Sequence, residues 1–198
     1  HGMHRPSDLQ DAQRLVAYLH NFLRNADGEF LVSQDADLGG HEKTAHFVDG
    51  HLYYAKSDAE RRAQGMPRID SHVYAMENGL AIGALSALAV ATGSAADAGS
   101  YLASAEKAAK RMLSRHVEVD GTVKRDAVAT SSLRFLVDAA ALGRGLAMLQ
   151  RARPQANLVP ILERLAAAML RNFKDDQSGL LWTSTLDPAA SGVFAQRS

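Results

Sequence analysis

Two carboxylates, Asp35 and Asp37, stand two residues apart in the segment FLVSQDADLGG (30–40). In an extended segment, residues two apart point to the same side, so we expect the two carboxylates to share a face. Close carboxylates push their pKa values apart, which suits a general acid working with a general base, and they could also hold a hard cation. The alternative is an Asp-rich turn in which both carboxylates accept hydrogen bonds from backbone amides.

Four more polar residues surround the expected start of an apolar helix. Glu77 and Asn78 open this helix, and His72 and Tyr74 precede it. A helix N-terminus attracts anionic or polar ligands, so Glu77 is a candidate catalytic carboxylate. The candidate substrate-binding residues are His72, Tyr74 and Asn78. The helix dipole alone also accounts for Glu77, and His72 and Tyr74 could equally be core residues with satisfied polar tips.

Asp126 is the fourth candidate catalytic carboxylate, because it ends a loop that is expected to share a rim with Asp35. Asp138 lies inside an apolar helical stretch, where a buried charge needs a partner, and Arg134 stands four residues before it. We expect a structural ion pair there rather than catalysis.

Trp182, the only tryptophan, is expected to fill a space between hairpins, with a sugar platform as the alternative.

Three histidines, His41, His46 and His51, recur every five residues. Neither a helix nor a strand places that spacing on one face, so no preformed zinc site is expected. The chain has no cysteine, which excludes disulfides, thiolate nucleophiles and Cys-based metal sites. We therefore expect no metal and no cofactor, and the absence of cysteine fits a reducing, cytoplasmic location.

Charge and hydropathy narrow the choice of partners. Twenty-two basic residues balance 22 acidic ones with no run of five like charges, which argues against nucleic acid and an anionic membrane as partners. The longest apolar stretch, 79–91, is too short to span a bilayer. A chain of 198 residues, 46% of them hydrophobic, suffices for one globular domain.

Five helices are expected to position the candidate residues. They run from Ser7 to Gly28, over 77–92, 96–116 and 132–151, and from Asn157 to Phe173. Ser7 makes a capping box with Gln10, and Asn157 caps the last helix. The helices 77–92 and 132–151 are apolar almost all round and should be the most buried, whereas the other three carry a polar face.

A weak internal repeat links these helices. A polar turn, a glycine and a short apolar piece follow each amphipathic helix, in the segments 25–35, 117–126 and 175–187. Gly121 and Gly179 are 58 residues apart, and Gly28 and Gly121 are 93 apart. The difference of 35 matches an irregular insertion over 33–68. The repeating unit is therefore a buried helix, an outer helix and a hairpin-like loop.

Such units stack in a solenoid or close into a ring, and the very apolar inner helices favour a ring. We expect an all-α fold, a partial (α/α)6 toroid of helical hairpins with short β-hairpin loops. It forms a single segment over 4–198, with 1–3 a tag remnant. Five helices are fewer than half of those in a six-hairpin ring, so the chain is either a fragment or self-associates through its apolar helices.

Several segments together resemble the thioredoxin-domain-containing, spermatogenesis-associated-like family. They are FLVSQDADLGG (30–40), FVDGHLYYA (47–55), RIDSHVYAMENGLAIGALSALAVATG (68–93) and SSLRFLVDAAALGRGLAMLQ (131–150). The resemblance covers most of the chain. It implies a six-hairpin, glycosidase-like toroid related in shape to N-acylglucosamine 2-epimerases, and a thioredoxin-like domain in the parent protein. Glu77 stands where the family usually has an aromatic residue, and the cysteines of the thioredoxin-like part are missing, so neither sugar stacking there nor redox chemistry is carried over.

The leading hypothesis is a carbohydrate-directed domain with an isomerase- or hydrolase-like carboxylate site on one rim. The competing hypothesis is a non-catalytic structural or interaction domain that packs against a thioredoxin-like domain. An open pocket where the carboxylates converge would favour the first hypothesis. All three loops should lie at one end of the ring, together with the N-termini of the inner helices.

Overall fold

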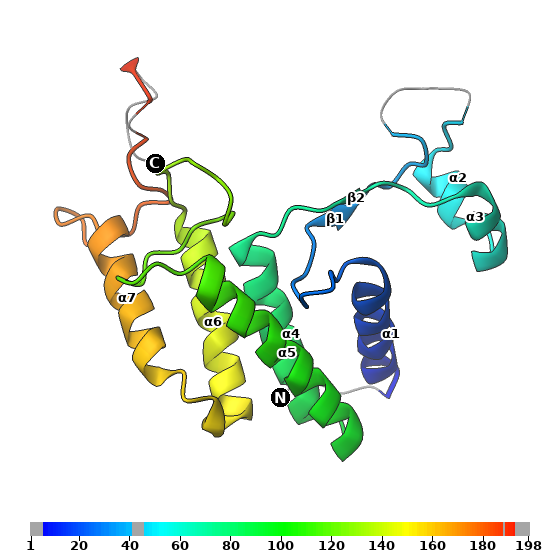
Figure 1. Ribbon diagram of the computed structural model, residues 1–198, viewed down its shortest axis with the longest axis horizontal. Coiled ribbons are helices and arrows are strands. Elements are labelled where there is room, and N and C mark those ends of the chain that lie inside the picture. The colour runs from blue at the N-terminus through cyan, green and yellow to red at the C-terminus, as the bar shows by residue number, and fades with distance from the viewer. Residues whose placement is uncertain (1–5, 41–45, 188, 193–198) are drawn as a thin grey trace.

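The computed structural model describes residues 6–40, 46–187 and 189–192, so the tag remnant expected at 1–3 and His41 lie outside it. In chain order, the elements are α1 (Pro6–Phe22), β1 (Ser33–Gln34), α2 (Gly50–Tyr54), α3 (Asp58–Gln64), β2 (Ile69–Asp70), α4 (Ala75–Ala91), α5 (Ala95–Arg115), α6 (Leu136–Ala152), the 3-10 helix η1 (Pro154–Ala156) and α7 (Val159–Phe173) (Figure 1). The segment of α2 and α3 extends away from the other helices on the far side of α1. No helix in the described part of the chain is long and apolar enough to cross a membrane.

The apolar helices α4 and α6 form the inner layer and pack directly on each other. A Cβ atom built on Gly145 would lie 2.1 Å from the carbonyl oxygen of Gly79, and one built on Gly79 would lie 2.5 Å from the carbonyl carbon of Ala141. The lack of a side chain at both glycines permits this close approach of the two backbones. The fully buried core side chains include Ile82, Leu85, Met112, Leu142 and Leu146.

The outer helices α5 and α7 each keep one face in water. Lys107 and Lys110 of α5 are exposed, whereas Ala105 and Ala109 on its other face are buried. The predicted alternation of buried and amphipathic helices is therefore confirmed. The inner helices are not covered all round, however, because they leave apolar side chains such as those of Leu80, Val90 and Val137 exposed.

The three repeat loops share one pattern of backbone pairing. Antiparallel bridges close the turns, between Arg24 and Phe30, Val117 and Val123, and Lys174 and Leu181. The loop glycines Gly28, Gly121 and Gly179 all have positive φ angles, of 89°, 89° and 75°. Only glycine adopts this backbone region readily, which explains its place in each copy. The predicted repeat is confirmed.

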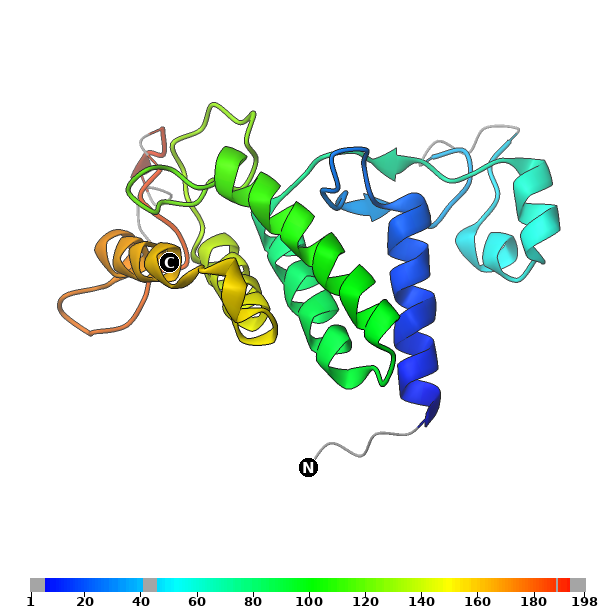
Figure 2. The same ribbon diagram turned by 60° about the horizontal axis from the view of Figure 1, so that its bottom comes forward.

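Each inner helix begins against the loop of the following hairpin. The amide of Ala75 in α4 donates to the carbonyl oxygen of Arg125 at 2.9 Å, and the amide of Leu136 in α6 donates to that of Thr183 at 2.9 Å. The first loop also reaches α4, through the side-chain amide of Asn78. The loops and the inner-helix N-termini therefore lie at one end of the molecule, as expected (Figure 1), and the segment of α2 and α3 lies beyond α1 in the view of Figure 2.

The segment 33–68 is more regular than the sequence indicated. β1 and β2 pair in antiparallel fashion, with Ser33 opposite Asp70 and Gln34 opposite Ile69. Along the chain, the helices α2 and α3 stand between these two strands, and α3 begins with a capping box made by Ser57. With 5 and 7 residues, these helices are too short to show a hydrophobic period in the sequence.

Two predicted helix caps are wrong. α1 begins at Pro6, so Ser7 lies inside its first turn, and proline itself suits the first helical position. Asn157 adopts a left-handed conformation, with a φ of 50°, where η1 ends. The amide of Leu158, just before α7, is bonded instead by the side-chain oxygen of Gln150 at 2.5 Å.

Candidate functional site

A row of alternating charges runs along one face of the ribbon formed by β1 and β2. The Nε atom of Arg68 donates to Asp35 at 3.0 Å, and Nδ1 of His72 lies 2.6 Å from the Asp70 carboxylate. Residues two apart in an extended chain point the same way, so Arg68, Asp70 and His72 share this face. The row leads to Tyr74, directly before the first turn of α4.

The imidazole of His72 is held in place by Asp70. One oxygen of Asp70 accepts a hydrogen bond from the His72 amide at 3.0 Å and also contacts the ring. The hydrogen bond to Asp70 and then the charge of Asp70, aided by that of Asp126, raise the pKa of His72 above its ordinary value of 6.5. The backbone amide and the ring of His72 in turn lower the pKa of Asp70. The His72 side chain is 57% exposed, so a ligand can reach it.

Tyr74 and Asp126 meet at the start of α4. They form an antiparallel bridge, which is fixed by the neighbouring bond from Ala75 to the second loop. The rings of Tyr74 and His72 lie with their centroids 5.7 Å apart. One carboxylate oxygen of Asp126 accepts the amide of Val128 at 3.0 Å. Three predicted site residues, His72, Tyr74 and Asp126, therefore gather at one point of the rim.

Glu77 and Asp138 occupy equivalent positions in the first turns of α4 and α6. Each stands three residues after the residue that precedes its helix, Tyr74 or Phe135. Asp138 is fully buried and accepts a hydrogen bond from Arg125 at 3.0 Å. One buried oxygen of each carboxylate, Oε2 of Glu77 and Oδ1 of Asp138, has no hydrogen-bond partner among the described residues. Buried polar atoms are normally bonded, so a water molecule or a ligand hydroxyl is the natural partner for each.

The expected ion pair between Arg134 and Asp138 is not formed. α6 begins only at Leu136, so Arg134 precedes the helix, and the spacing of four residues no longer places the two side chains on one face. Arg134 donates to the carbonyl oxygen of Ser131 at 2.8 Å and lies 3.5 Å from Glu118. Arg125, from the second loop, takes its place beside Asp138.

Asp37 and Asn78 are engaged in structural contacts. One oxygen of Asp37 accepts the amide of Gly50, the first residue of α2, at 2.7 Å. The chain bends at Asp37, so this carboxylate and that of Asp35 have different partners. Asn78 is fully buried, and its side-chain amide bonds to both backbone groups of Phe30. Asp37 and Asn78 thus have contacts within the fold, and their action on a ligand stays a prediction.

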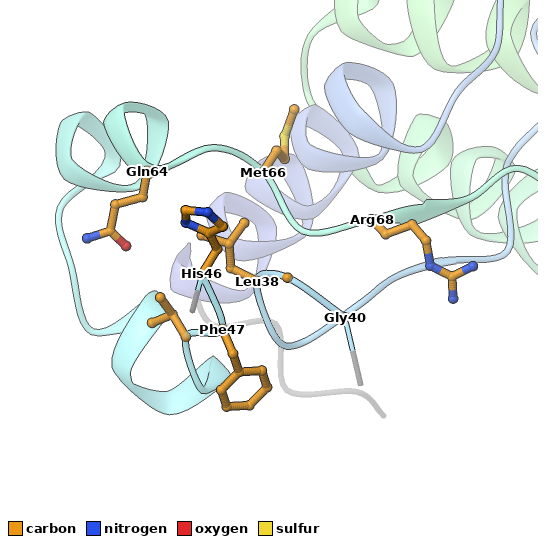
Figure 3. Close-up of a pocket in the computed structure, with 9 residues that line it drawn as sticks. Leu38, Gly40, His46, Phe47, Gln64, Met66 and Arg68 are labelled. Atoms are coloured by element: carbon orange, nitrogen blue, oxygen red, sulfur yellow. The ribbon is translucent and has the colours of Figure 1, made fainter. Parts of the chain in front are cut away.

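A cavity of about 680 Å³ lies next to the segment of α2 and α3, away from the rim (Figure 3). Its lining includes Leu38, His46, Phe47 and Met66, and Arg68 points away from these side chains. None of the predicted catalytic carboxylates lines it. Within the described residues, no group of three His, Cys, Asp or Glu side chains could hold a metal ion.

Sequence reasoning missed Arg68, Asp70 and Arg125. The alternation of polar residues in RIDSHVY (68–74) is the period of an extended segment and was the available signal. The partner strand lies more than 30 residues away, at Ser33, so the pairing that aligns the charges could not be deduced from the local pattern.

The chain is similar in structure to several solved proteins. A sugar epimerase from a ruminal bacterium matches with a TM-score of 0.64 and 10% identity, over 97% of this chain and 43% of that one. A D-mannose isomerase matches with a TM-score of 0.64 and 12% identity, over 98% of this chain and 46% of that one. The chain has an α/α-toroid fold. It spans less than half the length of either protein.

An α-mannanase from Bacteroides thetaiotaomicron is also similar, with a TM-score of 0.52 and 19% identity, over 67% of this chain and 37% of that one. No family model matches the sequence, and no curated protein sequence matches it. At these identities, the similarity establishes the toroid fold of the chain.

Proposed function

We propose that this toroid segment carries a carbohydrate-directed site at the rim where Asp70, His72, Tyr74 and Asp126 meet. The observation that carries the proposal is the His72 imidazole, held by Asp70 and placed beside Asp126 at the N-terminus of an inner helix. Polar ligands are attracted to such a helix end. The structurally similar sugar epimerase and D-mannose isomerase support a sugar as the ligand.

The site suits proton transfer next to a sugar carbonyl better than hydrolysis. Glycoside hydrolysis needs two carboxylates flanking the scissile bond, whereas isomerisation needs one group that removes a proton and returns it. The hydrogen bond to Asp70 and then the charge of Asp70 raise the pKa of His72 above 6.5, and the same contact orients the ring that would carry the proton. In the proposed reaction, His72 takes the proton from C2 of an open-chain aldose and O1 gains the proton of the O2 hydroxyl, so that an enediol(ate) forms. His72 then returns its proton to C1 as the carbonyl forms at C2, which yields the ketose. Asp126 and Glu77 accept hydrogen bonds from sugar hydroxyls, and Asp70 orients the ring.

The test uses D-mannose in deuterated water, with proton NMR to follow exchange at C2 and formation of the ketose. We expect slow turnover by the chain and a loss of about 100-fold or more for His72→Gln, the usual size of a general acid–base contribution. His51→Gln removes another exposed histidine and serves as the matched control. Equal rates for wild type and His72→Gln, or no exchange with the wild type, would contradict the proposal.

A second candidate is an interaction domain that packs against the thioredoxin-like domain implied by the family resemblance. The exposed apolar side chains of the inner helices favour it, because Val90 is 74% exposed and Leu80 and Val137 are each 46% exposed. A partner domain would cover these side chains. Hydrogen exchange slowed in α4 and α6 on mixing with a thioredoxin-like domain, without any sugar turnover, would favour this candidate.

A further inference from the structure

The ribbon of β1 and β2 separates the rim site from a second cavity. Side chains alternate between the two faces of a strand, so Gln34 points away from the face that holds Ser33 and Asp35. Gln34 lines a cavity of about 630 Å³, which is enclosed by α1 on one side and by α2 and α3 on the other. The volume is that of an ordinary small-molecule site. None of the rim residues lines this cavity.

Four aromatic side chains line the cavity: Tyr18, Phe22, Tyr53 and Tyr54. They are a third of the 12 aromatic residues of the chain, whereas Phe30 is the only aromatic residue among the fully buried members of the main core. The rings of Tyr18 and Phe22 lie 5.3 Å apart, and those of Tyr53 and Tyr54 lie 5.0 Å apart in an edge-to-face arrangement. These four rings thus line a cavity outside the main core cluster.

Two of the four rings, those of Tyr18 and Tyr53, carry hydroxyl groups that donate hydrogen bonds within the fold. The hydroxyl of Tyr53 donates to Gly65 at 2.8 Å, and that of Tyr18 donates to Gln34 at 2.7 Å. Burial, and then the charge of nearby Tyr54, raise the pKa of Tyr18, so these two phenols face the same space. Tyr54 remains 46% exposed and is approached by the Arg61 guanidinium at 5.7 Å.

The polar groups around the aromatic rings supply both donors and acceptors. Asp58 forms ion pairs with Arg62 at 2.7 Å and with Arg61 at 3.7 Å, and Gln34 adds an amide. A carboxylate, two guanidinium groups and an amide can hydrogen-bond to several neighbouring hydroxyls at once. The two arginines outweigh the single acid, which disfavours a cationic ligand.

We propose that this aromatic cavity binds one neutral hexopyranose unit of a carbohydrate, as a holding site apart from the reacting rim. The apolar face of the sugar ring would lie on Tyr54 and Tyr18, and its hydroxyls would bond to Asp58, Arg61 and Gln34. The choice of a sugar rests on the proposed function, while the cavity and its lining do not. A sugar chain held here would lie across the ribbon from His72.

The test measures binding of mannotetraose and of maltotetraose by titration calorimetry and by saturation-transfer NMR. Tyr54→Ala should weaken binding about 2- to 12-fold, the range that corresponds to one aromatic contact. Tyr54→Phe keeps the ring and should bind like the wild type. Leu52→Ala changes an exposed residue of the same helix outside the cavity and is the control. Asp126→Asn should leave this binding unchanged while it reduces turnover of D-mannose.

The outcomes separate the two proposals. Binding that Tyr54→Ala weakens, in a protein without D-mannose turnover, supports the aromatic cavity and overturns the rim site. Binding that is lost in Asp126→Asn but unchanged in Tyr54→Ala overturns the cavity proposal and leaves the rim site standing. Absence of oligosaccharide binding to the wild type also overturns the cavity proposal, whatever the result of the D-mannose assay.

Discussion

At the scale of single residues, the pKa of His72 is the measurable property that reports on the rim site. Its pKa is raised mainly by Asp70, so Asp70→Asn should lower the pKa of His72 toward 6.5. A two-dimensional NMR titration of the histidine rings measures this change, with His51 as an internal reference. An unchanged pKa of His72 in Asp70→Asn would show that the contact between the two side chains does not exist in solution.

The raised pKa also gives the sign of the effect of pH on folding. A group that binds its proton more tightly in the folded state stabilises the fold below its unfolded pKa of 6.5, and this stabilisation is lost as pH rises through the folded pKa. Because His72 is exposed, the effect on the free energy of unfolding is expected to be small.

The pKa of His116 is shifted in the opposite direction from that of His72. His116 is 1% exposed, and burial lowers its pKa below 6.5, although its Nδ1 atom contacts the carbonyl oxygen of Lys124 at 3.2 Å. Its neutral form therefore stabilises the fold above pH 6.5, and this stabilisation is lost as pH falls through the folded pKa.

We predict that His116→Phe removes a step from the pH dependence of unfolding by urea below pH 6.5. Wild type and the exposed-site control His51→Ala should both retain the step. A step of the same size in His116→Phe would assign it to other groups.

At the scale of elements, the contact between α4 and α6 depends on the absence of a side chain. Gly145→Ala would place a Cβ atom 2.1 Å from the Gly79 carbonyl oxygen, so it should destabilise the fold by about 1–3 kcal/mol, the usual cost of overpacking. Gly143→Ala, in the same helix, meets no atom within 4 Å and should stabilise the fold by about 0.5–1 kcal/mol. Thermal unfolding of both variants tests the prediction, and a destabilised Gly143→Ala together with a neutral Gly145→Ala would refute it.

The sequence predicted the long helices and their order of burial for two reasons. The outer helices keep a period of 3.6 residues over four or more turns, whereas the inner helices are apolar almost all round. The repeat of the loops was equally accessible, since a polar turn with a glycine follows each amphipathic helix. The caps at Ser7 and Asn157 were not predictable from residue type alone, because the position of a helix end decides whether a side chain can reach a free amide. The same holds for Arg134, which would pair with Asp138 only inside a longer helix.

The candidate site was predictable in part. His72, Tyr74 and Asp126 flank loops and helix starts that the sequence defines, and the structure brings them together. The Asp70 carboxylate contacts the His72 ring, and the Asp37 carboxylate accepts a hydrogen bond from the amide of Gly50. Both outcomes depend on how the chain folds between β1 and β2, and a pairing between distant short strands leaves little trace in a local pattern.

At the scale of the whole molecule, the exposed apolar side chains of α4 and α6 affect how the chain associates with other protein molecules. The chain spans 43% and 46% of the two toroids that it matches with a TM-score of 0.64, and the inner helices expose Leu80, Val90 and Val137. An apolar face of this kind is typical of an interaction surface.

We therefore predict a dimer or higher assembly, measured by light scattering across a range of concentrations. Val90→Lys combined with Val137→Lys should shift the equilibrium toward the monomer, because lysine is costly to bury without a partner. The exposed Val159 of α7 lies outside the inner layer, so Val159→Lys is the control. A stable wild-type monomer at high concentration would refute the prediction.

The bond from each inner helix to the next loop makes the order of chain synthesis matter. The amide of Ala75, the first residue of α4, donates its hydrogen bond to the carbonyl group of Arg125, which is synthesised 50 residues later. The amide of Leu136, the first residue of α6, donates to the carbonyl group of Thr183, 47 residues later. On a ribosome, each inner helix would emerge with its first turn open and would be closed only after the following hairpin had appeared. During synthesis, the inner helix made last would therefore always lack the hydrogen bond that closes its first turn.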